Sequence, residues 1–285
     1  MVKYEPVSHF HFHPTDTTPL MSGVYHVVIS QDEHYIATKT FSGTLQIIDL
    51  HTKNAIATRR NMKINGAFIF APNHKLPYYY QEAIHCWDYY NGQDIILWWV
   101  PPHWKQSGHL QNIICTNTIY RESDCTCLFV LAASDKTYLI PITNEMPSPT
   151  VTLPKLPIGC ELVWNEDTKL YTMPTGDHVV IYDANFHAAE TFSPPHLLKY
   201  HDGGGLFPIS RHEIRYPNRT FLSPDGKWLL LDYFTCLILM RREDHSILFC
   251  LFSHTGKVAQ HMGFSDATHF YYTWGNTTYI QPIDV

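Results

Sequence analysis

The sequence predicts an all-β fold in which six repeats of four antiparallel strands form a single domain over residues 1–285. Three observations support this prediction. The chain contains 18 tyrosines and 15 phenylalanines, and aromatic residues favour strands. Polar turns between two apolar segments recur along the chain, as they do in β-hairpins. A further apolar segment follows each of these turns at a nearly constant distance.

The polar turns mark the hairpin between the first two strands of each repeat. In residues 221–231, FLSPDGKWLLL, one apolar segment enters a tight polar turn and a second apolar segment leaves it. Equivalent turns that precede apolar segments are found at Ser30–Glu33, Ala71–His74, Arg121–Asp124, Trp164–Asp167 and Phe264–Ala267.

A third strand is predicted 15 to 17 residues after each turn. These strands end at Ile47–Leu50, Cys86–Tyr89, Leu139–Ile142, Ile181–Ala184, Leu239–Arg242 and Ile280–Ile283. Fourth strands are predicted at Ala55–Thr58, Ile95–Trp99, Thr150–Leu153 and Ile247–Cys250. Such a regular order of segments indicates a repeat protein.

Two segments show which repeat family the chain resembles. Residues 43–57 (GTLQIIDLHTKNAIA) and 84–96 (IHCWDYYNGQDII) resemble blades of WD-repeat, or WD40-like, β-propellers, and Trp87-Asp88 is a literal Trp-Asp pair. That family has four strands per blade and a period of about 40–45 residues. The resemblance implies a six-bladed β-propeller. Seven blades are the alternative, if a further strand lies within residues 193–217.

The N-terminal segment is predicted to close the propeller. The sixth repeat ends after its third strand, and an open sheet edge would remain without a fourth. The family resemblance implies that the N-terminus supplies it, and residues 4–12 are strand-like. In SHFHFHP (residues 8–14) histidines alternate with phenylalanines, so His9, His11 and His13 are expected to face solvent. A metal site is the alternative, but the outer two histidines are too far apart on a strand to share one ion.

Two insertions identify the candidate binding residues. Successive turns are 41 or 42 residues apart, except for intervals of 51 and 59 residues. The excess lies in residues 101–111 and 193–217, between the outer strand of one repeat and the inner strand of the next. In a propeller all such connections open onto one face, so this face is predicted to bind a partner. The predicted partner-binding residues are His103, Trp104, His109, His196, Tyr200, His201, Arg211, His212 and Arg215.

The insertions also allow a plainer interpretation, in which aromatic anchors hold two surface loops whose polar groups lie in water. Exposed Trp, Tyr and Arg are nevertheless the usual hot-spot residues of protein interfaces. In Trp98-Trp99, on a predicted outer strand, one indole is expected to pack inward and the other is a candidate for exposure.

No motif predicts catalysis. His-Glu-x-x-His and Gly-x-Ser-x-Gly are absent, and Gly203–Gly205 lacks the Lys-Ser/Thr of a phosphate-binding loop. No metal or other cofactor is therefore predicted, and the leading hypothesis is a non-catalytic module that binds another protein. One alternative is a metal-assisted hydrolase or lyase that uses the loop histidines. Another is a propeller that binds a carbohydrate or a small ligand through its aromatic loops.

Charge, hydropathy and cysteine content limit the possible partners and cellular location of the protein. The formal net charge of −6 comes with no long basic run, which argues against nucleic-acid binding. No apolar run reaches the roughly 18 residues of a spanning helix, and no signal core begins the chain. Seven cysteines without framework spacing, mostly in apolar segments, predict reduced and buried thiols in a cytoplasmic protein, which is expected to be monomeric. For Cys125 and Cys127, core packing is favoured over pairing or metal binding.

Overall fold

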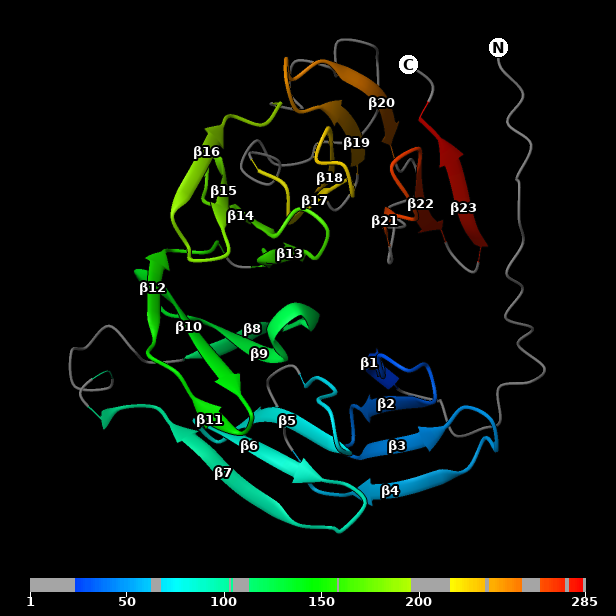
Figure 1. The fold of residues 1–285 in the computed structure, drawn as a ribbon, viewed down its shortest axis with the longest axis vertical. Coiled ribbons are helices and arrows are strands. Elements are labelled where there is room, and N and C mark those ends of the chain that lie inside the picture. Colours follow the sequence, from blue (N-terminus) through cyan, green and yellow to red (C-terminus); the bar gives the residue numbers. More distant parts are fainter. Residues whose placement is uncertain are drawn as a thin grey trace. The chain divides into compact units, whose positions relative to one another are not determined.

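The computed structural model describes residues 24–62, 68–102, 104, 113–157, 159–195, 216–233, 236–252, 262–274 and 277–283. The chain divides into two compact units. We call them the N-terminal unit, with the described residues up to Lys155, and the C-terminal unit, with those from Leu156 onwards. Each is described by itself. Both consist mainly of antiparallel sheets that follow one another in chain order (Figure 1).

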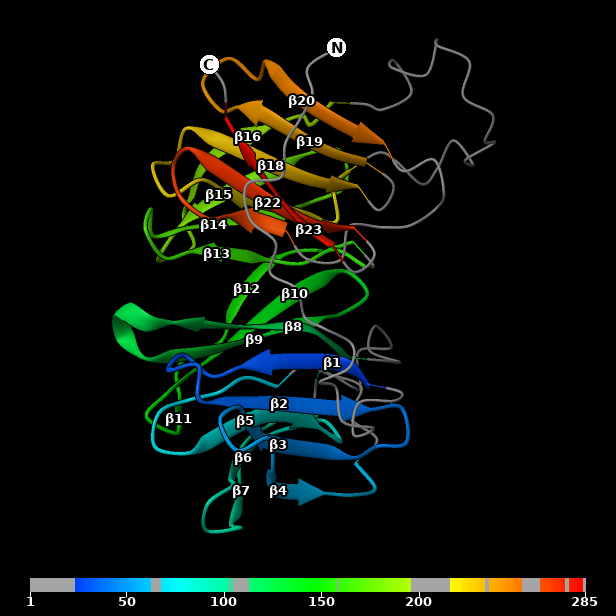
Figure 2. The same cartoon turned by 90° about the vertical axis from the view of Figure 1, so that its right-hand side faces the viewer.

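The described part of the N-terminal unit holds three sheets. The first contains β1 (Val24–Ile29), β2 (Tyr35–Thr40), β3 (Leu45–Asp49) and β4 (Ala55–Arg59), side by side in that order (Figure 2). The second contains β5 (Lys75–Tyr80), β6 (Ala83–Asp88) and β7 (Asp94–Trp99), with isolated bridges from Phe68 and Ala71 to β5 in place of a first strand. The third contains β8 (Ile114–Arg121), β9 (Thr126–Ala132), β10 (Lys136–Thr143), β11 (Met146–Pro147) and β12 (Val151–Pro154). Both β11 and β12 pair with β10 and together replace a continuous fourth strand.

The described part of the C-terminal unit also holds three sheets. The fourth sheet of the chain contains β13 (Val163–Asn165), β14 (Leu170–Pro174), β15 (Val179–Asp183) and β16 (Ala188–Phe192). The fifth contains β17 (Arg219–Leu222), β18 (Trp228–Tyr233), β19 (Cys236–Arg241) and β20 (Ile247–Phe252). The sixth contains β21 (Met262–Phe264), β22 (His269–Trp274) and β23 (Thr277–Pro282).

Each predicted repeat corresponds to one of these sheets. All six predicted turns lie between a first strand, or the bridge residues that replace it, and a second strand, and all six predicted third strands are present. The predicted fourth strands are also found, and β16 is a fourth strand that the sequence pattern did not predict. The closing strand at residues 4–12 remains a prediction, since residues 1–23 lie outside the described part of the chain.

The strand order gives every sheet two different ends. Turns between first and second strands and between third and fourth strands lie at one end, which we call the hairpin end. Turns between second and third strands lie at the other end, together with the links to the next sheet. We call this the connection end. Both insertions predicted to bind a partner therefore belong to connection ends.

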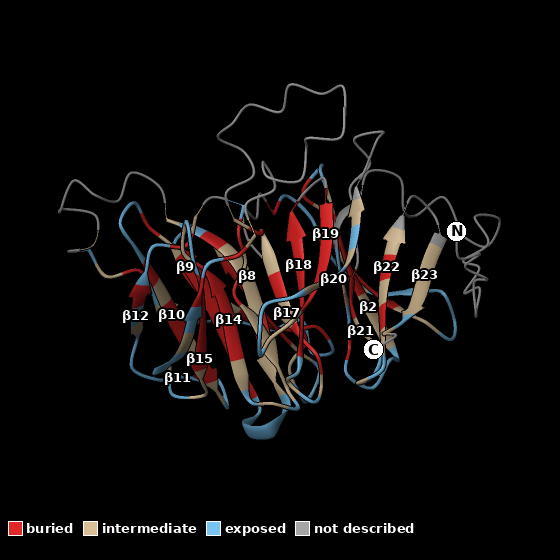
Figure 3. Ribbon diagram, turned by 90° about the horizontal axis from the view of Figure 1, so that it is seen from above, coloured by how far each residue is buried: buried red, intermediate tan, exposed pale blue. Residues whose placement is uncertain are grey.

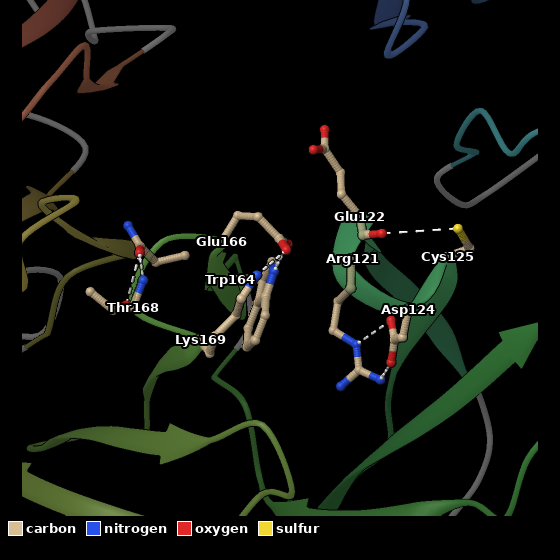
Figure 4. Close-up of polar contacts among 9 residues, drawn as sticks. Arg121, Glu122, Asp124, Cys125, Trp164, Glu166, Thr168 and Lys169 are labelled. Carbon is tan, nitrogen blue, oxygen red and sulfur yellow. Dashed lines mark hydrogen bonds and ion pairs between the residues drawn. The ribbon is translucent and has the colours of Figure 1, made fainter.

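Short polar side chains form the turns of the hairpin ends. Ser30 and Ser223 each donate a hydrogen bond to the aspartate two residues later, at 2.6 and 2.7 Å. In the N-terminal unit Arg121 pairs with Asp124 across the 3₁₀ turn η3 (Glu122–Asp124) (Figure 4). In the C-terminal unit the turn from Trp164 to Lys169 is tied by the Glu166 carboxylate, which accepts a hydrogen bond from the Trp164 indole at 2.5 Å (Figure 4). These contacts satisfy turn groups locally, which is why Ser, Asp and Asn recur there.

The aspartates that end third strands have the same kind of role. Asp49, Asp88 and Asp183 each accept two backbone N–H hydrogen bonds from the turn that follows, at 2.7–3.1 Å. Hydrogen bonds from the turn lower the pKa of all three carboxyls, so they are anionic at neutral pH. The repeated Ile-Asp, Trp-Asp and Tyr-Asp pairs of the sequence therefore mark a strand end followed by a capped turn.

A β-bulge recurs at the same place in four sheets. Between the third and fourth strands the register skips one residue of the fourth strand, namely Ile56, Leu97, Ala189 or Leu248. A bulge bends the strand that carries it and increases its local twist. Its recurrence in four sheets agrees with the structural repeat that the sequence predicts, although no sequence pattern marks the bulge itself.

Within each unit, the hydrophobic core lies between consecutive sheets. In the fifth sheet, Leu229 and Leu231 pack against residues of the fourth sheet such as Val179, whereas Leu230 packs against Phe270 of the sixth sheet. Adjacent residues of β18 therefore serve different interfaces, and β14, β18 and β19 are buried over most of their length (Figure 3). The second sheet likewise packs on the first and on the third. Burial on both faces explains the continuous apolar segments of the middle strands.

Polar contacts join neighbouring sheets at their inner and outer strands. Near the inner strands, the side-chain amide of Gln31 donates to the Phe70 carbonyl oxygen at 3.0 Å, and that of Asn165 donates to the Leu222 oxygen at 2.9 Å. Further out, Arg59 of β4 pairs with Asp94 of β7 at 2.8 Å. Burial acts to raise the pKa of Asp94, but hydrogen bonds from surrounding side chains outweigh it and lower the pKa. These contacts fix the sheets at one spacing.

The cysteines correct part of the prediction. Five thiols are buried, but Cys125 and Cys250 are exposed. The prediction of core packing holds for Cys127, which is buried, and is wrong for Cys125. The structure instead places Cys125 in the turn before β9, with a left-handed φ of 52°, so the two side chains do not share a face.

We expect the edge of β23 to need a partner strand. Deleting residues 1–13 removes the predicted partner, and an open edge promotes pairing between molecules. The truncated chain should therefore aggregate in size-exclusion chromatography or lose its cooperative thermal transition. A melting curve identical to that of the full chain would contradict closure by this segment.

Replacing His9, His11 and His13 together by alanine should change the free energy of unfolding by no more than about 0.5 kcal/mol, as for solvent-facing positions.

Candidate functional site

The structure describes one of the nine predicted site residues, Trp104. The other eight lie outside the described part of the chain: His103, His109, His196, Tyr200, His201, Arg211, His212 and Arg215. The site is therefore built from the residues where the two insertions leave and rejoin the sheets.

Trp104 anchors the first insertion. Its indole stacks on Tyr138 of β10 with ring centroids 3.9 Å apart, and it contacts Trp98 of β7 at 5.7 Å. Its backbone N–H donates to the Pro101 carbonyl oxygen at 3.0 Å. The indole is half-buried in the core between the second and third sheets. Trp104 thus fixes the beginning of the insertion to the outer strand β7 of the second sheet and to the third strand β10 of the third sheet.

Trp99 lies at the connection end of β7, directly before this insertion, and 60% of its surface is exposed. As the sequence predicted for the Trp98-Trp99 pair, one indole packs inward and the other faces solvent. Ile95 and Ile96 of the same strand are also exposed. The predicted partner-binding residues do not include Trp99, because that prediction counted only loop residues. The two adjacent tryptophans were the available signal.

The ends of the second insertion are held together in the C-terminal unit. Where it leaves the sheet, the Pro195 carbonyl oxygen accepts a hydrogen bond from the Tyr233 hydroxyl at 3.1 Å. Where it returns, the Asn218 N–H donates to the Asp232 carbonyl oxygen at 2.6 Å. Pro195 and Asn218 are thus both held by the end of β18, so the insertion has a fixed base.

An ion pair lies beside this base. Arg219 donates two hydrogen bonds to one carboxylate oxygen of Asp232, at 2.7 and 2.9 Å, and Asp232 is only 4% exposed. Burial raises the pKa of Asp232, and the arginine only partly offsets this. Burial also raises the pKa of Glu161, with Arg219 opposing the shift and Asp232 adding to it. Two buried carboxyl groups thus share the field of one arginine.

The hairpin end of the C-terminal unit contains an open cavity of about 900 Å³. Trp228 and Arg241 line it, with the Arg241 guanidinium 5.6 Å from the indole centroid. Two further cations of its wall are paired with carboxylates: Arg242 with Glu190 at 2.8 Å, and Lys227 with Asp225 at 3.1 Å. Since these opposite charges pair with each other, the lining indicates no particular class of ligand. The sequence prediction placed no site at this end.

Neither a metal site nor a membrane span is found in the described residues. No group of three or more His, Cys, Asp and Glu side chains in this part of the chain could hold an ion. The loop histidines of the metal-enzyme alternative lie outside it. No helix in the described segments is long and apolar enough to cross a bilayer.

Successive antiparallel sheets of this strand order are consistent with the class of β-propellers, and comparison with solved structures identifies this fold. The chain is similar to the crystal structure of the β-propeller domain of Myceliophteria thermophila Cps50 (Swd1), with a TM-score of 0.61. The similarity covers 92% of this chain and 84% of that chain at 13% sequence identity. The chain thus has a WD40-like propeller fold, as the sequence predicted, and this identity supports the fold alone. No protein-family profile and no curated protein matches the sequence.

The ion pair at the base of the second insertion should be pH-sensitive. Replacing Arg219 by methionine leaves the buried Asp232 carboxylate unpaired, which typically costs about 3 kcal/mol of unfolding free energy at pH 7. Near pH 4 the cost should shrink, because Asp232 has a raised pKa and protonation removes its charge. Chemical unfolding of both proteins at the two pH values measures the difference.

A matched control is Arg241→Met, since Arg241 is half-buried and lies 3.7 Å from its carboxylate partner Asp244. Loss of such a weak pair should cost less than about 1 kcal/mol at either pH. If Arg219→Met costs the same at pH 4 and pH 7, its contribution is packing and not charge.

Proposed function

We propose that this protein is a non-catalytic interaction module that binds a partner protein through the connection ends of its sheets. The observation that carries the proposal is the pair of tryptophans at the first insertion. Trp104 is stacked and fixed, whereas Trp99 beside it is 60% exposed. The predicted site residues of both insertions, including Arg215, belong to the same proposal.

An exposed tryptophan on a rigid strand suits partner binding. Tryptophan is among the residues most enriched in interface hot spots, and a β-strand loses little conformational entropy when it binds. On the same face of β7, Ile96 is also exposed, because Trp99 and Ile96 pair with Ala83 and His85, two positions apart on β6. Isolated exposed apolar residues are ordinary on a protein surface, but an apolar strip beside a long insertion supports an interface.

A protein is the favoured partner on grounds of charge. The chain has a formal net charge of −6, and its sequence contains no long basic run. These features disfavour a phosphate backbone, which needs a basic surface. A cytoplasmic location and a monomeric state, both expected from the sequence, are part of the proposal. Size-exclusion chromatography with light scattering tests the monomeric state.

The test compares two exposed aromatic residues of the same sheet. Trp99→Ala should weaken partner binding by about 2 kcal/mol, a hot-spot amount, with little loss of stability. Tyr90→Ala is the matched control, because Tyr90 is 77% exposed at the hairpin end of this sheet. Quantitative affinity capture from source lysate identifies proteins retained by the wild type and by Tyr90→Ala but lost by Trp99→Ala. Titration with the purified partner then gives the affinities.

A capture profile unchanged by Trp99→Ala would contradict the role of the first insertion. For the second insertion, Arg215→Ala should weaken binding by a similar amount of about 2 kcal/mol. Substitutions in the hairpin-end turns Ser30–Glu33 and Ser223–Gly226 should not weaken binding. If they weaken it more than the insertion variants, the hairpin ends are the binding surface. A stoichiometric transition metal in protein purified without a His tag would favour the enzyme alternative.

A further inference from the structure

Two thiols of the fifth sheet lie next to each other. Cys236 begins β19 and pairs in register with Phe252, whereas Cys250 of β20 pairs with Ile238. Side chains two positions apart on a strand share a face, so Cys236 and Cys250 are diagonal neighbours on one face of the sheet. Their sulfur atoms are 3.4 Å apart. This is hydrogen-bonding distance for two thiols, and a closer approach of the sulfurs would allow a bond.

The two thiols differ in access and acidity. Cys236 is 5% exposed, whereas Cys250 lies on the exposed outer strand. A hydrogen bond from the Cys236 S–H lowers the pKa of Cys250. Donation of that hydrogen bond and burial of the Cys236 thiol both raise the pKa of Cys236. A thiol that is accessible to solvent, has a lowered pKa and lies beside a second thiol has the features of a peroxide-reactive cysteine with its resolving partner.

We propose that Cys250 and Cys236 are a redox modification site that a hydroperoxide converts into an intramolecular disulfide. The Cys250 thiolate attacks one peroxide oxygen, the O–O bond breaks, and a sulfenic acid forms as the other oxygen leaves as hydroxide. The Cys236 sulfur then attacks the Cys250 sulfur, and the sulfenic oxygen leaves as water with the thiol proton. In total, two thiols and one hydrogen peroxide give one disulfide and two waters.

The remaining thiols of the chain lack this combination. Cys115 is only 4% exposed, and its S–H donates to the Asn117 carbonyl oxygen at 3.6 Å. Burial raises the pKa of Cys86, Cys127 and Cys160 to about 12, so these thiols stay protonated and shielded. Cys125 is exposed, but its S–H points to the Glu122 carbonyl oxygen at 3.9 Å and not to a second thiol of the described chain (Figure 4). Cys125 is therefore a matched control for an accessible cysteine without a resolving partner.

The bond would form close to the base of the second insertion. Cys236 of β19 is the register partner of Tyr233 of β18. The Tyr233 hydroxyl donates a hydrogen bond to the Pro195 carbonyl oxygen, where the insertion leaves the sheet. Joining β19 to β20 at this point restrains the connection end of the fifth sheet. The proposal rests on the geometry of the two thiols and stands whether or not the insertion binds a partner.

The experiment treats the reduced full-length protein with a small excess of hydrogen peroxide, blocks remaining thiols with N-ethylmaleimide and digests without reductant. The expected product is one peptide pair joined through Cys236 and Cys250, lighter by two hydrogen atoms and released by dithiothreitol. Cys125→Ser should form it at the same rate. In Cys236→Ala, Cys250 should stop at the sulfenic acid, which dimedone traps. Cys250→Ser should leave Cys236 unoxidised.

The wild-type measurement alone decides the proposal, so it does not depend on how well the variants fold. Recovery of Cys236 and Cys250 as separately alkylated peptides after peroxide treatment would overturn it. Dimedone labelling of wild-type Cys250 at the level of Cys236→Ala would also overturn it, because resolution by Cys236 would then be absent. Disulfide-linked dimers through Cys250 would show that the oxidation joins two chains instead.

Discussion

Packing of each sheet against its neighbours within one unit is the constraint on which the structure depends. A four-stranded sheet in water leaves two faces exposed, and burial of apolar surface contributes roughly 25 cal/mol per Å². The fifth sheet obtains this contribution twice, because Leu231 and Leu230 of β18 enter cores shared with the fourth and the sixth sheets. Stability in such an array is a sum over sheet–sheet interfaces. A sheet with an open face or edge therefore needs a further partner.

The same constraint leaves the ends of the sheets free to vary. The hairpin ends use short self-contained turns, in which Asp49, Asp88 and Asp183 accept backbone hydrogen bonds. The connection ends carry the two insertions. These are held by contacts to the sheets: the Trp104–Tyr138 stack in one case and the Tyr233–Pro195 hydrogen bond in the other. A rigid scaffold with anchored loops can change its binding surface without changing its core.

At the outer strands, buried residues of a sheet lie next to solvent-exposed residues. Residues of β19 are buried almost throughout, whereas exposed and half-buried residues alternate along β20. A buried thiol and a solvent-facing thiol can therefore become neighbours only where a middle strand meets an outer one, as Cys236 and Cys250 do. The outer strand β7 places the exposed Trp99 beside the packed Trp98 in the same way. Both features arise because an outer strand has one neighbour strand and is only partly covered by the next sheet.

The sequence by itself determined the order of the strands within the six described sheets, the position of each hairpin turn and the ends of the third strands. These features depend on local turn chemistry and on apolar segments, which a single sequence displays directly. Tertiary structure alone decided the recurring bulges, the left-handed turn that separates Cys125 from Cys127 and the approach of Cys236 to Cys250. It also decided that Trp98 is packed in the core and that its neighbour Trp99 is exposed. Such outcomes depend on register and on contacts between sheets, since the diagonal neighbour of a residue belongs to another strand and leaves no mark in its local sequence.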